Sequence, residues 1–415
     1  MKTAEVRFTR DVGKSVAVGR LADDNGRIYF EYSPETLKLG LNLSPFRLPF
    51  EDGLFEHTDK KFGPLPGLVD DSLPDGWGLL LMDRHFQNLR MDLAGISPLH
   101  RLLWLGTRTM GALTYHPPID RKNVDPHAFD LHDLALRSQK ILSGSSHEIL
   151  PQLLLAGGSP GGARPKVLVG VRGKDLISGA DDLPEGFEHW MVKFFAKEDP
   201  EDIGAVEYAY SLMAGAAGID MPPTRLFETS EGGRFFGARR FDRDGNRRCH
   251  LHTFGGLIQA NFRVPSNDYA DLLKVTLLLT RNQKDVAQMF RRMVFNVFAH
   301  NRDDHVKNFS YIMDDTTGEW TISPAYDLMY ALGPGGEHTM TVAGEGKNPG
   351  IAHMLELAKR AGIPQKDAKA IIEEVRSAIS QRSKFAARAG VGSKGKKLFF
   401  GKYECDSPHR KTQTL

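Results

Sequence analysis

A run of polar residues directly after a strongly apolar helix constrains this chain most. Residues 285–300 place apolar side chains on one face at spacings of three and four, which predicts a helix buried along that face. The segment that follows, residues 300–308, reads HNRDDHVKN and is predicted to be a loop delivered by this helix. Residues 308–314 and 320–322 then predict a hairpin that carries the chain to another acid, Asp327.

The spacing of the polar residues in this region is typical of phosphoryl transfer. Asp303 and Asn308 have the Asp-x-x-x-x-Asn spacing with which protein kinases hold a substrate hydroxyl and a Mg²⁺ ion, and Asp327 follows where a second metal-binding acid is needed. We therefore predict Asp303 as the base, and Asn308 and Asp327 as Mg²⁺ ligands. His305 and Lys307 are predicted to support the loop or to contact the γ-phosphate. The alternative is a solvated polar turn that caps the preceding helix.

The residues around the second acid exclude one class of kinase. Asp327 lies in Tyr-Asp-Leu and not in the Asp-Phe-Gly of ordinary eukaryotic protein kinases. The chain is therefore expected to belong to a different family of kinases.

A glycine-rich segment and a lysine strand form a second polar constellation upstream. Residues 157–166 read GGSPGGARPK, and glycines let backbone N–H groups approach anionic oxygens closely. The segment matches neither common phosphate-loop motif, so a plain turn is the alternative. Lys193 alternates with apolar neighbours in a predicted strand at 190–195, as a nucleotide-binding lysine does, but a lysine on an open sheet face would look the same. Glu207, on a helix predicted at 205–217, is either its partner or a surface glutamate.

Length and charge limit the classes of protein to consider. At 415 residues the chain exceeds the ~250–300 at which single cores stop growing, so two or three packed units are expected. The 54 basic and 52 acidic residues leave a net charge of +2, which gives no global reason to expect nucleic acid or an anionic membrane as the main partner.

Cysteine usage and hydropathy indicate the compartment. Cys249 and Cys405 are too few for a disulfide framework and lack the spacing of a zinc site. The N-terminus lacks a secretory apolar segment, and the apolar runs are too short to span a membrane. We expect a soluble, cytoplasmic protein without a membrane partner.

The pattern along the chain predicts an α+β fold with several units. A hairpin at Asn25-Gly26 and a turn entering a helix at Gly76 are the clearest local signals in the first unit. The expected units are residues 1–118 as a mixed N-terminal subdomain, 119–135 as a linker, 136–245 as an ATP-binding N-lobe, 246–390 as a helical catalytic C-lobe and 391–415 as a mobile basic tail.

In the motifs of its catalytic loop, glycine-rich segment and N-terminal unit, the chain resembles the HipA family of toxin kinases from bacterial toxin–antitoxin pairs. The similarity covers about residues 1–390. Its motifs are Ser72-Leu73-Pro74-Asp75-Gly76-Trp77-Gly78, Met110-Gly111-Ala112-Leu113, Gly161-Gly162-Ala163-Arg164-Pro165-Lys166, Lys193, Phe295-Asn296, Asn301-Arg302-Asp303-Asp304-His305-Val306-Lys307-Asn308 and Ser323-Pro324-Ala325-Tyr326-Asp327.

The resemblance implies a two-lobed, protein-kinase-like fold that binds ATP and Mg²⁺ and phosphorylates a protein at Ser or Thr. Aminoacyl-tRNA synthetases are among the family's known targets. The usual partner is a small helix-turn-helix antitoxin of the HipB type that binds operator DNA. No helix-turn-helix is recognisable in this chain, so its DNA contact is expected to be indirect, with the Arg239–Arg248 cluster as a helper or as a solvated loop.

The resemblance also implies roles for single residues. Ser159 matches the family's self-phosphorylated serine, and a phosphate of roughly −1.5 to −2 charge there should eject the glycine-rich loop. The backbone of Arg239 and Phe241 is expected to read adenine. The nucleotide-binding residues are predicted to be Gly161, Gly162, Ala163, Lys166, Lys193, Arg239, Phe241 and Tyr326.

The chain departs from the family pattern at Arg164-Pro165, where the best-known member has two polar residues.

Two other functions remain open from the sequence. One is a kinase for a lipid or small molecule, because phosphoinositide kinases also use an Asp-x-His-x-x-Asn loop. The other is a non-catalytic co-repressor that acts through an antitoxin.

Overall fold

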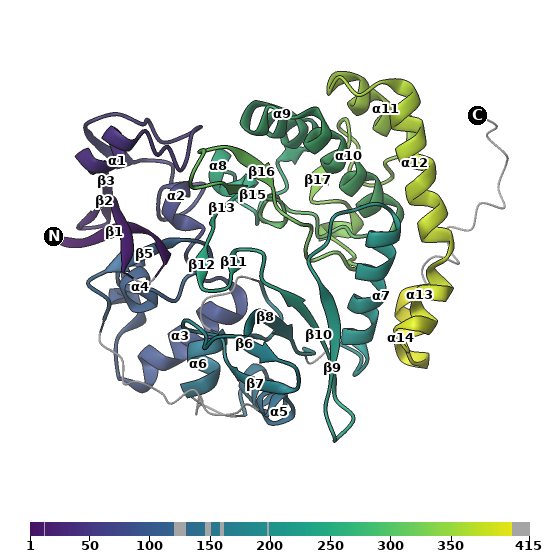
Figure 1. Cartoon of the computed structure of the whole chain (residues 1–415), viewed down its shortest axis with the longest axis horizontal. Coiled ribbons are helices and arrows are strands. Elements are labelled where there is room, and N and C mark those ends of the chain that lie inside the picture. The colour runs from purple at the N-terminus through teal and green to yellow at the C-terminus, as the bar shows by residue number, and fades with distance from the viewer. Residues whose placement is uncertain (12, 120–129, 146–150, 158–161, 197–198, 401–415) are drawn as a thin grey trace.

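The first sheet of the fold is antiparallel, with strand order β4-β3-β2-β1-β5 (Figure 1). The computed structural model describes residues 1–400 except 12, 120–129, 146–150, 158–161 and 197–198. The predicted hairpin is confirmed, because β2 and β3 pair across Asn25 and Gly26, both of which have positive φ. The strands are β1 Lys2–Asp11, β2 Lys14–Asp24, β3 Arg27–Tyr32, β4 Leu54–His57 and β5 Leu113–His116.

Four helices lie between the strands of this N-terminal region, and α3 and α4 both contribute to the core of the next unit. Trp77 and Leu81 of α3, and Trp104 of α4, belong to the hydrophobic core of the next unit and not to the core beneath β1–β5. Leu99 and Leu102 of α4 nevertheless belong to the core beneath β1–β5, so this helix packs on both. The expected N-terminal subdomain therefore shares its apolar surface with both lobes. The helices are α1 Pro34–Leu39, α2 Gly67–Asp70, α3 Gly76–Asn88 and α4 Pro98–Leu105.

A second antiparallel sheet, ordered β7-β6-β8-β10-β9, forms the N-lobe. Helix α7 packs on β9 and β10, and α5 and α6 add to the core beneath the sheet. The strands are β6 Lys166–Arg172, β7 Asp175–Ser178, β8 Glu188–Lys193, β9 Thr224–Glu228 and β10 Arg234–Arg239. The helices are α5 Leu131–Leu142, α6 Pro151–Gly157 and α7 Ile203–Ala216. This arrangement confirms the lysine strand and the helix after it.

The C-lobe is built from helices around a small sheet, β13-β15-β16. The predicted apolar helix is confirmed as α10, whose inward face is fully buried. The helices are α8 Phe254–Ile258, α9 Tyr269–Thr280, α10 Gln283–Phe298, α11 Ile351–Arg360, α12 Gln365–Ser380 and α13 Arg382–Arg388. The strands are β11 Arg243–Asp244, β12 Arg247–Arg248, β13 His250–Thr253, β14 Asn267–Asp268, β15 Ser310–Met313, β16 Trp320–Ile322 and β17 Met340–Thr341.

Two expected boundaries differ from the structure. Helix α5 begins at Leu131, inside the expected linker, because Asp130 caps it by accepting from the backbone N–H of His132 at 2.8 Å. The expected tail contains helix α14, Ser393–Phe400, which packs against α7. Its start is fixed by the N–H of Gly392, which donates to Oδ2 of Asp202 at 2.7 Å.

Helix α7 lies between two layers that are far apart in the sequence. In Figure 1 the sheet strands β9 and β10 flank it on one side, and α12, α13 and α14 flank it on the other. Arg234 of β10 extends this contact, because its Nη1 donates to the carbonyl of Gly390 at 2.7 Å. The C-terminal helices therefore support the N-lobe helix from outside.

Candidate active site

Lys193, at the end of β8, connects the two lobes. Its Nζ lies 2.5 Å from Oε1 of Glu207 on α7 and also pairs with Oδ1 of Asp327. Burial alone would lower the pKa of Lys193, but the charges of Asp327 and Glu207 outweigh burial and raise it. The structure thus brings together the lysine, the helix glutamate and the acid that the sequence placed in separate segments.

A second lysine lies beside the first. Lys166 of β6 is the register partner of Lys193 in β8, and the residue is 3% exposed. A Cβ added at Gly162 would lie 2.5 Å from Nζ of Lys166, so this amine sits directly beneath the end of the glycine-rich segment. Burial lowers the pKa of Lys166 to about 8, against the opposing charge of Asp327. Two cations therefore line the sheet side of the site.

The end of the glycine-rich segment is bound to the N-terminal region. The N–H of Gly162 donates to Oδ1 of Asp75, and the carbonyl of Gly162 accepts from the N–H of Trp77 at 2.9 Å. A Cβ at Gly76 would lie 2.5 Å from the oxygen of Gly162, so only glycine allows this approach. The family motif at 72–78 predicted no such contact, because nothing local in the sequence reveals a partner so far away.

The two neighbouring acids of the catalytic loop lie in different environments. Asp303 is exposed, whereas Asp304 is completely buried. Asp304 accepts from Oη of Tyr269 at 2.7 Å, the N–H of Thr339 at 2.8 Å and Nδ1 of His338, also 2.8 Å away. Asp304 therefore anchors the loop, and Asp303 is left facing the site.

The surroundings of Asp303 raise the pKa of its carboxyl group. Partial burial raises the pKa of Asp303, and the charges of Asp327 and Asp304 add to the shift, while His305 and Arg164 oppose it. A raised carboxyl pKa moves an acid toward the range useful for a general base.

Hydrogen bonds from side-chain amides to backbone carbonyls hold both predicted metal ligands. Nδ2 of Asn308 donates to the carbonyl of Asp303 at 2.6 Å and closes the loop. Asp327 has φ of 56°, a left-handed conformation that Asp adopts more readily than most residues. Its carbonyl accepts from Nδ2 of Asn301 at 3.4 Å, and the same amide reaches Oδ1 of Asn296 at 3.0 Å.

The donor chemistry at Asn308 and Asp327 fits Mg²⁺. Both residues offer hard oxygen atoms, and Mg²⁺ commonly binds one or two protein oxygens together with substrate phosphates and water. Within the described residues, no cluster of three or more His, Cys, Asp or Glu could hold a metal ion. A Mg²⁺ ion at these two residues would take its remaining ligands from a bound nucleotide and water.

The other two residues predicted in the catalytic loop lie beside Phe262 of the C-lobe, and Lys307 also reaches the N-terminal region. Nζ of Lys307 lies 3.4 Å from Oδ2 of Asp70 and 5.1 Å from the centre of the Phe262 ring. The His305 ring also lies 5.3 Å from Phe262. Of the two roles predicted for these side chains, this geometry favours support of the loop.

The residues predicted to bind adenine lie where β10 leaves the N-lobe. Arg239 is the last residue of β10 and pairs with Glu188 at 3.0 Å, which leaves its side chain on the surface. The rings of Phe241 and Tyr326 are 5.7 Å apart and tilted by 31°. Oη of Tyr326 donates to the carbonyl of Lys307 at 2.8 Å, so this ring is fixed to the catalytic loop.

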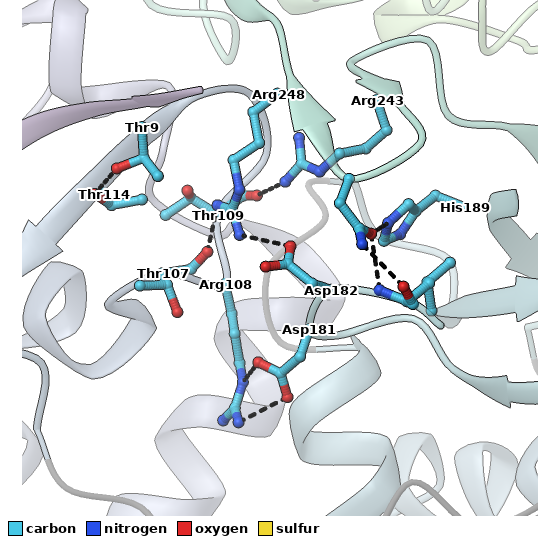
Figure 2. Close-up of polar contacts among 12 residues, drawn as sticks. Thr9, Thr107, Arg108, Thr109, Thr114, Asp181, Asp182, His189, Arg243 and Arg248 are labelled. Carbon is cyan, nitrogen blue, oxygen red and sulfur yellow. Dashed lines mark hydrogen bonds and ion pairs between the residues drawn. The ribbon is translucent and has the colours of Figure 1, made fainter. Parts of the chain in front are cut away.

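Most of the Arg239–Arg248 cluster is buried and is not a solvated loop. Figure 2 shows Arg243 and Arg248 pointing toward residues 107–109 of the N-terminal region. Nη2 of Arg243 donates to the carbonyl of Thr109 at 3.0 Å, and Nη1 of Arg248 donates to that of Thr107 at 2.6 Å. Arg108 of the N-terminal region forms a bidentate salt bridge with Asp181 of the N-lobe, at 2.7 and 2.9 Å (Figure 2).

A buried carboxylate at the centre of this network holds its cations. Asp242 accepts from Arg240 and Arg243 at 2.7 and 2.8 Å, and from the N–H of Gly111 at 2.7 Å. Burial would raise the pKa of Asp242, but the guanidinium groups hold it well below its usual range. The expectation of a solvated loop was wrong, because sequence alone does not reveal these partners.

Two predicted site residues, Ser159 and Gly161, lie outside the described residues. Ala163 follows Gly162 in the described part of the segment. Among the residues that the structure describes, no helix has both the length and the apolar character needed to cross a membrane.

The two lobes, with a lysine-bearing sheet on one side and an acid-bearing helical lobe on the other, define a protein-kinase-like fold. A family model described as "HipA-like C-terminal domain" matches residues 158–383, and one described as "HipA N-terminal domain" matches residues 12–116. The chain belongs to the HipA family.

Two known proteins extend this comparison. The chain superposes on HipA in the solved complex "Shewanella oneidensis MR-1 Toxin Antitoxin System HipA, HipB and its operator DNA" with a TM-score of 0.70 at 15% identity, over 97% of this chain and 95% of that one. A Sinorhizobium fredii protein named "Putative kinase Y4dM" is 27% identical over 156 residues. That match spans 34% of this chain and 37% of the relative.

Proposed function

We propose that this protein is the serine/threonine-protein kinase toxin of a toxin–antitoxin system and transfers the γ-phosphate of ATP to a protein. The observation that carries the proposal is the meeting of Lys193, Glu207 and Asp327 beside the exposed Asp303. Kinases need a lysine on the phosphates, a helix glutamate that fixes this lysine and an acid for the metal. Membership of the HipA family supports the same conclusion.

Each group in the site has a role in this scheme. Lys193 and Lys166 would bind the ATP phosphates from the sheet side. Mg²⁺ would neutralise charge on the phosphates from Asn308 and Asp327. Asp303 orients the attacking hydroxyl and accepts its proton. The backbone of Arg239–Phe241 and the ring of Tyr326 would receive adenine.

The biological setting follows from the family. A HipB-type helix-turn-helix antitoxin is the proposed partner, and contact with operator DNA is made through it; the complex named for the Shewanella protein supports this assembly. An aminoacyl-tRNA synthetase is the substrate class that the family suggests. We further propose that self-phosphorylation at Ser159 switches the kinase off.

The test is transfer of label from γ-labelled ATP with Mg²⁺ to proteins in a lysate of the source cells. Wild type is compared with Asp303→Asn, Ser159→Ala and a control, Glu319→Gln, which changes an exposed acid on the hairpin between Asn308 and Asp327. We expect protein label at Ser or Thr with wild type and the control, none with Asp303→Asn, and no self-label in Ser159→Ala.

Three outcomes would count against the proposal. Label on a lipid or metabolite but on no protein would identify a different kinase. Absence of ATP binding by wild type would favour a co-repressor that works only through its antitoxin. Self-label that persists in Ser159→Ala would refute the Ser159 switch and leave the kinase standing.

A further inference from the structure

Arg164 occupies the position between the glycine-rich segment and the two acids of the C-lobe. It lies two residues after Gly162 and two before Lys166, and its side chain is 29% exposed. Its charge acts on both Asp303 and Asp327. Arg164 therefore lies within electrostatic range of both acids, whereas Lys193 is engaged with Glu207 and Asp327.

One edge of the guanidinium is fixed. Nε and Nη2 of Arg164 donate to the two carboxylate oxygens of Asp199, at 2.9 and 3.0 Å. Asp199 is itself held by the N–H of Ala196, which donates to it at 2.9 Å, three residues beyond Lys193. A two-pronged pair of this kind sets the plane of the guanidinium, so its remaining N–H groups have a defined direction.

The other end of the guanidinium has a weak partner. Nη1 of Arg164 donates to Sδ of Met329 at 3.4 Å, and a thioether is a poor acceptor for a charged donor. Met329 lies two residues after Asp327, so this N–H points to the wall of the site that carries the predicted metal ligand. A phosphate oxygen would be a much stronger acceptor than sulfur for the same N–H.

We propose that Arg164 forms the γ-phosphate subsite, with its Asp199-bound edge fixed and its Nη1 edge turned from Met329 to the terminal phosphate. This inference rests on the proposed kinase function. The hydroxyl held by Asp303 must meet the terminal phosphate, and Arg164 has a guanidinium N–H beside Met329 and a charge that acts on Asp303. ADP lacks this phosphate, so the subsite discriminates ATP from ADP.

The test compares binding of ADP and of β,γ-imido ATP, an analogue that does not transfer phosphate, by calorimetry in the presence of Mg²⁺. The variants are Arg164→Gln, Arg164→Lys, Asp199→Asn and a control, Arg172→Gln, whose side chain is exposed at the far end of β6. We expect Arg164→Gln to weaken the analogue about tenfold or more, equivalent to about 1.4 kcal/mol, and to leave ADP affinity unchanged. Arg164→Lys should recover part of the loss, because it keeps the charge without the fork.

Asp199→Asn should weaken the analogue less than Arg164→Gln, because the guanidinium remains but its orientation is no longer fixed. The control should match wild type with both ligands. Circular dichroism at the binding temperature establishes that each variant is folded.

The outcomes separate this inference from the proposed function. If wild type binds neither ligand, both fail. If wild type prefers the analogue over ADP and Arg164→Gln keeps that preference, only the subsite is refuted. An equal loss of both ligands in Arg164→Gln would also overturn it, because a loop that is merely disturbed weakens both.

Discussion

The indole Nε1 of Trp77 donates a hydrogen bond to the carbonyl of Lys166 at 3.1 Å, although 89 positions separate the two residues. Trp77 belongs to α3 of the N-terminal region, and Lys166 begins the first N-lobe strand and places its amine beneath Gly162. The N-terminal region is therefore part of the frame that holds the nucleotide lysine.

Trp77→Phe should keep most of the buried ring and remove only this donor. Leaving the buried oxygen without its partner costs about 1–3 kcal/mol of unfolding free energy, and we expect ATP affinity to fall as well. Denaturant unfolding and nucleotide calorimetry measure the two effects. Trp190→Phe is the control, because it also loses an indole hydrogen bond, the 3.2 Å bond to Glu188 in the sheet that contains Lys166. Equal ATP affinity in both variants would contradict the prediction.

Glu207→Gln should reduce kcat by about 100-fold, because a misplacement of about 1 Å at Lys193 has consequences of that size. The amide removes the charge that balances Lys193 and leaves this lysine drawn toward Asp327 alone. Steady-state kinetics with varied ATP give kcat and KM separately. The matched control is Glu231→Gln, in the exposed turn between β9 and β10. Unchanged kcat in Glu207→Gln would show that Lys193 needs no partner on α7.

ATP affinity should weaken as the pH rises through about 8. Burial lowers the pKa of Lys166 to about 8, so its amine is charged below that pH and neutral above it. A charged amine attracts phosphate, and linkage limits the loss to about tenfold per pH unit. Calorimetry between pH 7 and 9 measures this pH dependence of the ATP affinity. Lys166→Met should bind more weakly at pH 7 and lose this dependence, while Lys174→Met, exposed in the turn after β6, should keep it.

Stability should fall as the pH drops below 6.5, the ordinary pKa of histidine. Burial lowers the pKa of His250 to about 3, so the folded protein keeps this ring neutral while the unfolded chain takes up a proton. The stabilisation is complete above 6.5 and is lost at about 1.4 kcal/mol per pH unit down to about 3. Denaturant midpoints at pH 7 and 5 test this. His250→Leu should flatten the slope, whereas Phe8→Leu, which alters a ring 6.3 Å from His250, should destabilise without changing it.

The sequence could predict what is encoded locally. The Asn25-Gly26 hairpin and the α10 helix depend on turn residues and apolar spacing within a few positions, and the structure confirms both. The motif spacing also allowed Asp303 and Asp327 to be singled out, although their roles stay predictions. Contacts between distant segments carry no comparable signal.

Buried polar contacts between distant segments account for the errors. The sequence suggested that Arg243 is a surface cation, but in the structure it donates hydrogen bonds to the carbonyls of Thr109 and Gly111. The end of the chain looked flexible because glycine and lysine disfavour a buried core, yet Gly392 donates to Asp202 before α14 begins. These interactions form only after the fold has brought the segments together.

The support of α7 by the C-terminal helices sets an order of events during synthesis. Helix α7 ends at Ala216, but α13 begins only at Arg382. At ~5–20 residues per second the ribosome makes the second segment roughly 10 to 30 s after the first. Until then Glu207 lies on a helix with one side uncovered, and Lys193 lacks a rigid partner. The N-lobe of the nascent chain is therefore made well before its catalytic geometry can be completed, and the candidate site is assembled only after the last helices have been synthesised.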